Sequence, residues 1–430
     1  MRVALVTPAY PPLPGGGERY VAALARGLAQ RGVDVTVVTS GATAEADLWR
    51  GASAAPQEVG DGLRVIRLPV RPFPGGRRGL MLWRKGMVML AAMPGDRTAA
   101  LRRMARRVPP LDGLDEALAG LADVALFHAF NVSWEHGLVS ADAAARAAGV
   151  PLVATPFAHL GERAGDRVAR NSTMVHQLAI LRAARRVLVL TGVERDGLAR
   201  YGVLPERVAV IGGGVDAPPD DFDTSPYWSG ANRLPEPYAV FVGRLSHDKG
   251  AIHAAEAIGR LRRRDRKVSL ALVGATTPEF ERFYRGLSPA ERVGLRPLGV
   301  LSERDKHAVL ARSRCLLLPS HSDSFGIVLL EAWSHGRPVI AARAGGIPGV
   351  VDEGVNGLLA PFGDVAALAD ATERLLADED LSQQMGERGR VKVARQYSWD
   401  AVAERVHGHY RAIIGEKVST DYTDFTDSTL

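Results

Sequence analysis

The stretch LLPSHSDSFGIVLLEAWSHGRPVIAARAGG, residues 317–346, decides the fold of this chain. It predicts a buried strand, a Ser- and Asp-rich loop, a helix, a second apolar strand and a Gly-Gly turn. Asp323 and Glu331 stand eight positions apart, the first in the loop and the second inside the helix. The first amides of a helix are unpaired and attract phosphate, and a carboxylate about one turn in accepts hydrogen bonds from sugar hydroxyls. The stretch therefore favours a site for a sugar nucleotide.

Composition sets the broad class of the protein. A chain of 430 residues predicts two domains or three, and 46% apolar with 24% charged residues is typical of a soluble globular protein. The single cysteine, Cys315, lies in an apolar run, which favours a buried thiol in a reducing compartment. The N-terminus predicts a strand rather than a signal peptide, and no stretch approaches the ~20 apolar residues of a membrane span. We expect a cytoplasmic protein.

Strand patterns alternate with helix patterns along both halves of the chain, which predicts an α/β fold with two doubly wound parallel sheets. The expected strands are 3–7, 33–39, 63–68, 124–127, 151–155, 187–190 and 208–211, followed by 238–242, 268–273, 315–318 and 338–341. Residues 212–230 are rich in Gly, Pro and Asp and form the best candidate for a linker. The expected domains are 1–215 and 216–398, with a helix at 399–415 that packs back towards the first domain and a disordered tail at 416–430.

Two loops follow predicted strands at the edge where open α/β sheets bind ligands. The glycines at 15–17 precede a helix, where backbone can approach a ligand closely, although an ordinary strand-to-helix turn is equally consistent with them. Arg244 and Lys249 fall in the loop VGRLSHDKG. Two cations one loop-width apart can neutralise a diphosphate, Arg by bidentate contact and Lys as a point charge. Their flanking glycines favour this function over that of solvated surface charge.

Two histidines are weaker candidates. His128 closes the strand pattern VALFH, and His159 closes PFAHLG after the next strand. A histidine at this edge can bind a sugar hydroxyl or act as a general base, whereas a structural histidine bonded to backbone is the alternative. The acids of DDFD, residues 220–223, lie among prolines and are interpreted as solvated rather than as metal ligands.

The net charge of +6 is concentrated in residues 71–110, which hold ten Arg or Lys against one acid, Asp96. Met, Leu and Trp are interleaved with these cations over residues 77–93. A helix lying on an anionic membrane surface has this composition. A groove for an acidic or lipid-linked acceptor and a solvated face over the core remain as alternatives.

Taken together, these loops resemble the retaining glycosyltransferases of family 4, which have two Rossmann-like domains facing across a cleft, the GT-B architecture. The resemblance runs from residue 1 to about residue 414. It is carried by PPLPGGGERYVAALARGLAQRGVDVTVV and TPFAHLG in the first half. In the second half it is carried by FVGRLSHDKG, PSHSDSFGIVLLEAWSHGRPVIA, AGGIPGVV and NGLLAPFGD.

The resemblance implies roles for individual residues. Arg244 and Lys249 match the basic pair that binds the donor diphosphate, and Asp323 and Glu331 match the E-x7-E motif, in which the second acid holds the ribose and the first approaches the donor sugar. The other implied donor contacts are Gly16, Gly17, Val300, Ser324, Phe325, Gly326, Ile327 and Val328. His128 matches a histidine that contacts the donor sugar, and His159 is expected to contact acceptor or sugar. The first acid of the motif is normally Glu, so Asp323 shortens its reach by one methylene.

We therefore expect a hexosyltransferase that moves a sugar from a UDP- or GDP-linked donor, bound by residues 216–398, to a sugar, lipid-linked or small-molecule acceptor on residues 1–215. Arg244, Lys249, Asp323 and His128 are the expected catalytic residues. No cofactor, metal or nucleic-acid partner is expected, and the enzyme is expected in the cytoplasm, with residues 71–110 as a candidate contact to the inner membrane face. The alternatives are a sugar-nucleotide epimerase, a phosphorylase or a non-catalytic sugar-nucleotide-binding protein on the same fold.

Overall fold

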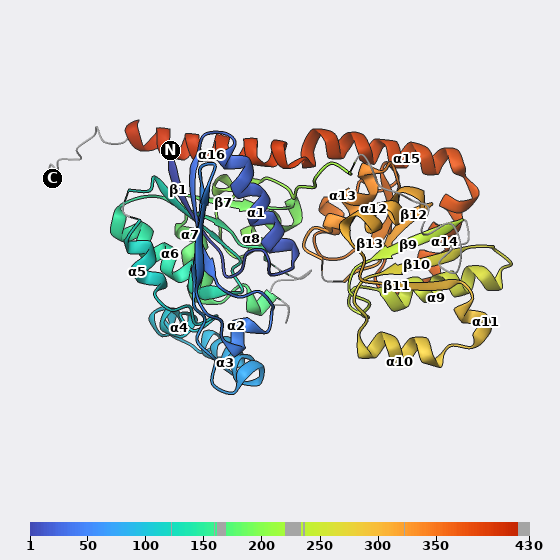
Figure 1. Ribbon diagram of the computed structural model, residues 1–430, viewed down its shortest axis with the longest axis horizontal. Helices are drawn as coiled ribbons and strands as arrows, with labels where there is room; N and C mark the ends of the chain where they lie inside the picture. The colour runs from blue at the N-terminus through green and yellow to red at the C-terminus, as the bar shows by residue number, and fades with distance from the viewer. Residues whose placement is uncertain are drawn as a thin grey trace, which may run out of the picture. The chain divides into compact units, whose positions relative to one another are not determined.

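The computed structural model describes residues 1–121, 123–158, 160, 169–219, 234, 237–321 and 323–419. The chain divides into two compact units, each with its own sheet. Unit 1 comprises Met1–Val189, Glu194–Ile211 and Trp399–Leu430, and unit 2 comprises Leu190–Val193 and Gly212–Ser398. The chain thus leaves unit 1 after its last strand, builds unit 2, and returns to unit 1 with its C-terminal helix (Figure 1).

Unit 1 is built on an eight-stranded sheet in the order β3-β4-β2-β1-β5-β6-β7-β8. All neighbours are parallel except β3, which pairs with β4 in the antiparallel sense. The strands are β1 (Arg2–Val6), β2 (Asp34–Ser40), β3 (Ala55–Gly60), β4 (Leu63–Leu68), β5 (Leu126–Phe130), β6 (Leu152–Thr155), β7 (Arg186–Val189) and β8 (Val208–Val210). The central strands are buried along their length, as expected for parallel strands covered on both faces.

The helices of unit 1 connect these strands and supply the other half of its core. They are α1 (Gly16–Ala29), α2 (Asp47–Arg50), α3 (Gly76–Ala91), α4 (Thr98–Ala105), α5 (Leu114–Ala119), α6 (Glu135–Ala148), α7 (Val175–Ala183), α8 (Gly192–Arg200) and α16 (Trp399–Ser419). The C-terminal helix α16 packs on α1, and Arg31, in the turn just after α1, forms ion pairs with Asp400 at 2.5 Å and with Glu404 at 2.9 Å. Helix α16 is therefore joined to the first helix of the same unit.

Unit 2 is built on a six-stranded, fully parallel sheet in the order β11-β10-β9-β12-β13-β14. Its strands are β9 (Tyr238–Val242), β10 (Ser269–Val273), β11 (Leu295–Gly299), β12 (Cys315–Leu318), β13 (Val339–Ala342) and β14 (Gly357–Ala360). Its helices are α9 (Ala251–Arg263), α10 (Pro278–Gly286), α11 (Pro289–Arg292), α12 (Glu303–Arg312), α13 (Ile327–Ser334), α14 (Val365–Ala377) and α15 (Glu379–Lys392). Side-chain caps fix several helix starts: Ser302 accepts from the amide of Asp305 at 3.1 Å, and Asp364 from that of Ala367 at 2.9 Å.

The two sheets confirm the predicted α/β class and its two parallel sheets. The sequence analysis did not identify the edge strands β3, β11 and β14, each of which contains Gly or Pro. Each sheet reverses its strand order at one point, between β1 and β5 in unit 1 and between β9 and β12 in unit 2. Loops that leave the carboxyl ends of such neighbours form the ligand-binding crevice of open α/β sheets.

Some predictions fall on residues outside the described ranges, namely His159, the acids at 220–223, most of the linker 212–230, and the tail beyond residue 419. Over the described part of the chain, every helix is too short or too polar to span a lipid bilayer.

Candidate functional site

The switch point of unit 2 brings the two most informative loops of the sequence together. One loop leaves β9 and carries Arg244 and Lys249, and the other leaves β12 and carries Asp323. The strands β9 and β12 are neighbours in the sheet, so their loops begin side by side. A backbone hydrogen bond from the amide of His321 to the carbonyl of Asp248, at 2.9 Å, joins the loops directly.

Lys249 and Asp323 form an ion pair between these two loops. The Lys249 Nζ lies 3.0 Å from Asp323 Oδ1, and the two side chains are 26% and 22% exposed. Asp323 Oδ2 is buried and has no hydrogen-bond partner among the described residues. A buried carboxylate oxygen without a donor costs free energy, so it is suited to accept a hydrogen bond from a ligand hydroxyl.

Arg244 is the more exposed of the two predicted cations, because its side chain is 60% exposed and that of Lys249 is 26% exposed. Its Nη2 lies 3.3 Å from Asp248 Oδ2, four residues further along the same loop. An exposed pair of this kind contributes little to stability, so Arg244 is free to exchange Asp248 for a diphosphate without a large cost.

The start of α13 is set by glycine conformations. Gly326 has φ +79° and caps the helix, so α13 begins at Ile327. The turn after β13 presses against this loop: the Gly346 amide donates to the Asp323 carbonyl at 2.8 Å, and a Cβ on Gly346 would lie 1.7 Å from the Ser324 carbonyl oxygen. The Gly-Gly turn therefore holds Asp323 in place.

The remaining predicted donor contacts of unit 2 differ in exposure. Ile327 and Val328, in the first turn of α13, are half-exposed, as is Ser324, so their amides lie near solvent. Phe325 is buried and its ring packs edge-on against Tyr397 at 5.5 Å, so its side chain supports the loop from inside. Val300 is 76% exposed in the loop that leaves β11, two strands from β9.

Glu331 is held by a residue that the sequence analysis missed. Glu331 Oε1 lies 2.8 Å from the Nζ of Lys306 on α12, and both side chains are only 10% exposed. Lys306 also contacts Glu303 at 2.7 Å, three residues earlier. This ion pair fixes the orientation of the Glu331 carboxylate, which is largely shielded from solvent. A lysine on a charged helix resembles ordinary surface charge in the sequence, so no signal in the chain indicated it.

The glycine loop of unit 1 leaves β1 at the other switch point. Gly16 and Gly17 are the first residues of α1. The carboxylate of Glu18 folds back over the loop, since a Cβ on Gly15 would meet Glu18 Oε2 at 2.0 Å. Burial raises the pKa of Glu18, and a hydrogen bond with its own backbone opposes that shift. A phosphate at this helix start would have to displace Glu18, which the sequence analysis did not identify.

His128 is placed differently from the prediction. Strand β5 runs from Leu126 to Phe130, so His128 lies in mid-strand and not at the carboxyl end. Its Nδ1 lies 2.6 Å from the hydroxyl of Tyr410 on α16, and its Nε2 lies 2.8 Å from that of Thr155 on β6. The ring is fully buried, and burial lowers its pKa to about 3. Both ring nitrogens are engaged, so the structure argues against the predicted contact with a donor sugar and for a structural role.

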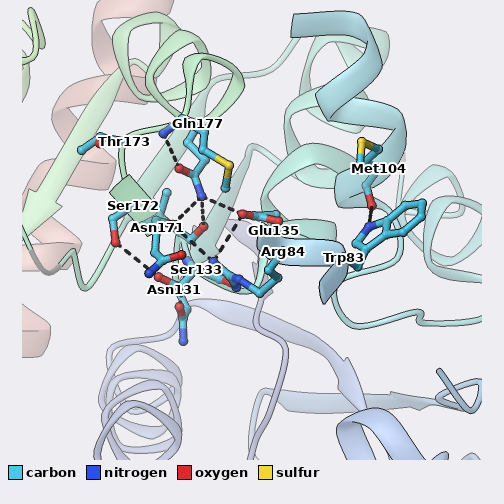
Figure 2. A network of polar contacts seen from close by, with 12 residues as sticks. Trp83, Arg84, Met104, Asn131, Ser133, Glu135, Asn171, Ser172, Thr173 and Gln177 are labelled. Carbon is cyan, nitrogen blue, oxygen red and sulfur yellow. Dashed lines mark hydrogen bonds and ion pairs between the residues drawn. The ribbon is translucent and has the colours of Figure 1, made fainter. Parts of the chain in front are cut away.

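The carboxyl end of β5 instead leads into a buried polar cluster (Figure 2). Gln177 of α7 donates to Glu135 Oε1 at 2.8 Å and to the carbonyl of Asn171 at 3.0 Å. Arg84 of α3 donates to the carbonyl of Ser133 and lies 3.6 Å from Glu135 Oε1. Glu135 is fully buried, its Oε2 has no partner among the described residues, and burial raises its pKa to about 7. No sequence pattern indicated this cluster, because its members are far apart along the chain.

Comparison with known proteins identifies the family. The model of the Glycosyl transferase 4-like domain matches residues 15–214, and that of the Glycosyl transferases group 1 family matches residues 228–392. The D-inositol 3-phosphate glycosyltransferase of Acidothermus cellulolyticus is 32% identical over 448 residues, which cover 97% of this chain and 91% of that protein. The chain belongs to the glycosyl transferases group 1 family. The alpha-D-kanosaminyltransferase of Streptomyces kanamyceticus is 27% identical over 417 residues, covering 91% of this chain and 98% of that protein.

Solved structures show the same architecture as this group 1 glycosyltransferase. Sucrose-phosphate synthase from Thermosynechococcus elongatus has a TM-score of 0.70 at 22% identity, covering 96% of this chain and 99% of that one. Anabaena HepE in complex with UDP has a TM-score of 0.70 at 16% identity, covering 96% and 100%. These structures confirm the predicted GT-B fold. The family models and relatives indicate a glycosyltransferase and do not favour the alternatives of an epimerase or a non-catalytic binding protein.

Proposed function

We propose that this enzyme transfers a sugar from a UDP- or GDP-linked donor to an acceptor hydroxyl with retention of the anomeric configuration. The observation that carries the proposal is the Lys249–Asp323 pair at the switch point of unit 2, with a cation and an unpartnered carboxylate oxygen beside a helix start. Anabaena HepE, which shares the fold, has been solved with UDP and with UDP-glucose. A nucleoside diphosphate sugar has the matching chemistry: a dianionic diphosphate joined to a ring of hydroxyls.

The proposed roles follow from charge and position. Arg244, Lys249 and the first amides of α13 stabilise the negative charge that develops on the leaving diphosphate, and this stabilisation is larger in the transition state than in the bound donor. Asp323 Oδ2 accepts a hydrogen bond from a hydroxyl of the donor sugar. Glu331, oriented by Lys306, accepts from the ribose hydroxyls. Val300 is proposed to lie near the base, contacting it through its backbone.

The transfer step is proposed to occur on one face of the sugar. The acceptor oxygen bonds to the anomeric carbon on the face that the diphosphate leaves, as the bond from that carbon to the diphosphate oxygen breaks. The acceptor proton passes to a phosphate oxygen of the leaving group, so no protein base is required. We also propose that no metal is required, because two cations and a helix start supply the electrostatic stabilisation that a metal otherwise provides.

The acceptor is proposed to bind unit 1, near the carboxyl ends of β1 and β5. The loop of Gly16 and Gly17 leaves the first of these strands, and the cluster around Glu135 follows the second. A sugar, a lipid-linked sugar or a small molecule would satisfy the hydrogen-bonding groups there. Residues 71–110 are proposed to bring the enzyme to the inner membrane face, and the protein is proposed to act in the cytoplasm.

The proposal is tested first on the donor. A thermal-unfolding panel of UDP-, GDP- and ADP-sugars should show one base whose sugar nucleotide raises the melting temperature, because a ligand that binds only the folded state stabilises it. With that donor and an accepted sugar, the enzyme should release nucleoside diphosphate, chelator should leave the rate unchanged, and NMR should show a product with the donor's anomeric configuration. An inverted product would overturn the retaining mechanism, and a rate abolished by chelator would overturn the metal-free one.

A further inference from the structure

Helix α3 has apolar residues on both of its faces. Leu80 and Met87 are 5% and 0% exposed and belong to the core of unit 1. Met81, Leu82 and Met89, on the opposite side, are 52%, 69% and 71% exposed. Single exposed apolar side chains are ordinary on a protein surface, but three large ones on one helix face are not, and such groups mark surfaces that bind a partner.

The exposed apolar residues share their face with cations. Arg78, Met81, Leu82, Lys85 and Met89 follow the spacing i, i+3, i+4, i+7 and i+11, which places them on one side of an α-helix. Arg78 and Lys85 are exposed, and neither forms a hydrogen bond or an ion pair with any described residue. No acid occurs in the sequence between Asp61 and Asp96. The face is therefore apolar and cationic, and no acidic residue nearby in the sequence balances its charge.

The structure separates these cations from others in residues 71–110 that are already neutralised within unit 1. Four of the ten have carboxylate partners: Arg71 pairs with Asp112, Arg84 with Glu135, Arg102 with Asp142, and Arg106 with Asp115. The basic segment is thus not a uniform patch, as its composition suggests. The charge available to an external partner includes that of Arg78 and Lys85 on α3 and of Arg103 on α4.

We infer that the outer face of α3 binds the surface of an anionic lipid bilayer. Met81, Leu82 and Met89 enter the headgroup region, and Arg78 and Lys85 contact lipid phosphates at the same level. Interfacial helices combine apolar side chains on one side with cations that reach anionic headgroups, and this face has both. An acidic protein groove would match the charges, but three flexible apolar side chains fit a fluid surface at least as well. Few groups take part, so the binding is weak and sensitive to salt.

The inner face of α3 contacts residues near the carboxyl end of β5 through Arg84. Arg84 donates to the carbonyls of Ser133 and Asn171 and approaches Glu135, all near the carboxyl end of β5. A bilayer bound by α3 would therefore lie against the part of unit 1 where the acceptor is proposed to bind, which favours an acceptor carried in the lipid layer. This consequence rests on the proposed function, whereas the lipid contact itself does not.

The test uses the full chain without substrate. The protein is sedimented with vesicles of phosphatidylcholine alone and with vesicles that also contain about 30 mol% phosphatidylglycerol. We expect binding to the anionic vesicles only, and weaker binding as salt rises from about 50 to about 300 mM. R78Q/K85Q should weaken binding roughly thirty-fold, since each cation near an anionic surface contributes about 1 kcal/mol. M81S/L82S/M89S should abolish it. K267Q/R388Q removes the same charge from unit 2 and should bind as the wild type does.

Two results would overturn the inference. One is vesicle binding that is unchanged in both α3 variants, or reduced equally in K267Q/R388Q, since that would reflect bulk charge. The other is self-association of the wild type that M81S/L82S/M89S removes, without any vesicle binding, since the face would then be a contact between copies. Release of nucleoside diphosphate with a water-soluble acceptor should be the same in wild type and α3 variants, so failure here is separable from failure of the proposed transferase reaction.

Discussion

The two sheets present their switch points to solvent in different ways. In unit 2 the loops after β9 and β12 carry an exposed guanidinium, a partly exposed Lys249–Asp323 pair and a helix start without a side-chain cap. In unit 1 the polar groups in and after β5 are turned inward: within the strand His128 is hydrogen-bonded to Tyr410 and Thr155, and after it Glu135 is fully buried and bonded to Gln177.

This difference separates two kinds of polar residue at the same edge of the same type of sheet. The unit 2 groups lose little when they exchange an internal partner for a ligand, because they are partly hydrated already. The unit 1 groups are held by several hydrogen bonds inside the core, where an unmatched charge is costly. We therefore propose that unit 2 binds the highly charged ligand, and that unit 1 fixes its own loops around a more neutral one.

Removing the Lys249 cation of unit 2 should have the greatest consequence for the reaction. Lys249→Ala should lower kcat by about 10²–10³-fold, because it removes charge stabilisation of the leaving diphosphate. Initial rates of nucleoside diphosphate release at saturating donor measure the effect. Lys267→Ala, an exposed lysine of the same unit, is the matched control and should leave the rate unchanged. Equal activity of Lys249→Ala and wild type would mean that the unit 2 switch point is not the donor site.

The buried carboxyl group of Glu135 in unit 1 predicts that the stability of the fold decreases as pH rises. The pKa of Glu135 is raised from 4.5 to about 7, so the folded state holds its proton over a range where the unfolded state has lost it. The stabilisation from the protonated form is present below pH ~4.5 and is lost as pH rises through ~7. Glu135→Gln has no proton to lose, so its stability relative to wild type should increase by about 3 kcal/mol between pH 4.5 and pH 8.

Chemical unfolding of Glu135→Gln and wild type at the two pH values measures this difference. The titration of His128 and the other buried histidines is common to both proteins and cancels in the comparison. A constant difference between the two proteins across this range would show that Glu135 stays ionised in the fold, held by Arg84 at 3.6 Å. The inward-facing description of the unit 1 cluster would then have to be abandoned.

The Lys306–Glu331 pair differs from the other polar groups of the unit 2 site, because both of its side chains are only 10% exposed. Glu331→Gln should weaken binding of the donor nucleotide by about 10–100-fold, the loss expected for hydrogen bonds to a charged group. Lys306→Met should weaken it through Glu331, which would lose its orientation. A double-mutant cycle read by calorimetry should give a coupling of about 1 kcal/mol or more. Additive effects would show that Lys306 does not position Glu331.

Local sequence patterns were sufficient to predict most of the fold and the central residues of the unit 2 site. Apolar runs of four to seven residues bounded by Gly or Pro marked the central strands, and residues just after them, such as Lys249 and Asp323, had to lie at the ligand-binding edge. These inferences need only the chain order, because the topology of a doubly wound sheet brings successive carboxyl ends together.

Features that depend on side chains from distant elements were not predictable in this way. The end of β5 was misplaced because the apolar pattern continues through His128 as far as Phe130, and burial of that ring depends on Tyr410, 282 residues away. Gln177 and Glu135 lie 42 residues apart, and Lys306 and Glu331 lie 25 apart. Each of these side chains is polar and looks solvated in the sequence until packing supplies its partner.

The smallest expected effect concerns Asp323, where the family's motif normally has Glu. Asp323→Glu adds one methylene, so the carboxylate moves by about one carbon–carbon bond against Lys249, whose pairing distance is now 3.0 Å, and against the Gly345–Gly346 turn. The charge is kept and only the reach of the side chain changes, so kcat/KM for the native donor should fall by less than about tenfold. The ratio of the kcat/KM values for two donor sugars should shift. Asp323→Asn keeps the length and removes the charge, and it should lower kcat for every donor alike. If the two variants changed donor preference equally, the carboxylate would act through its charge on Lys249 and not through a contact with the sugar.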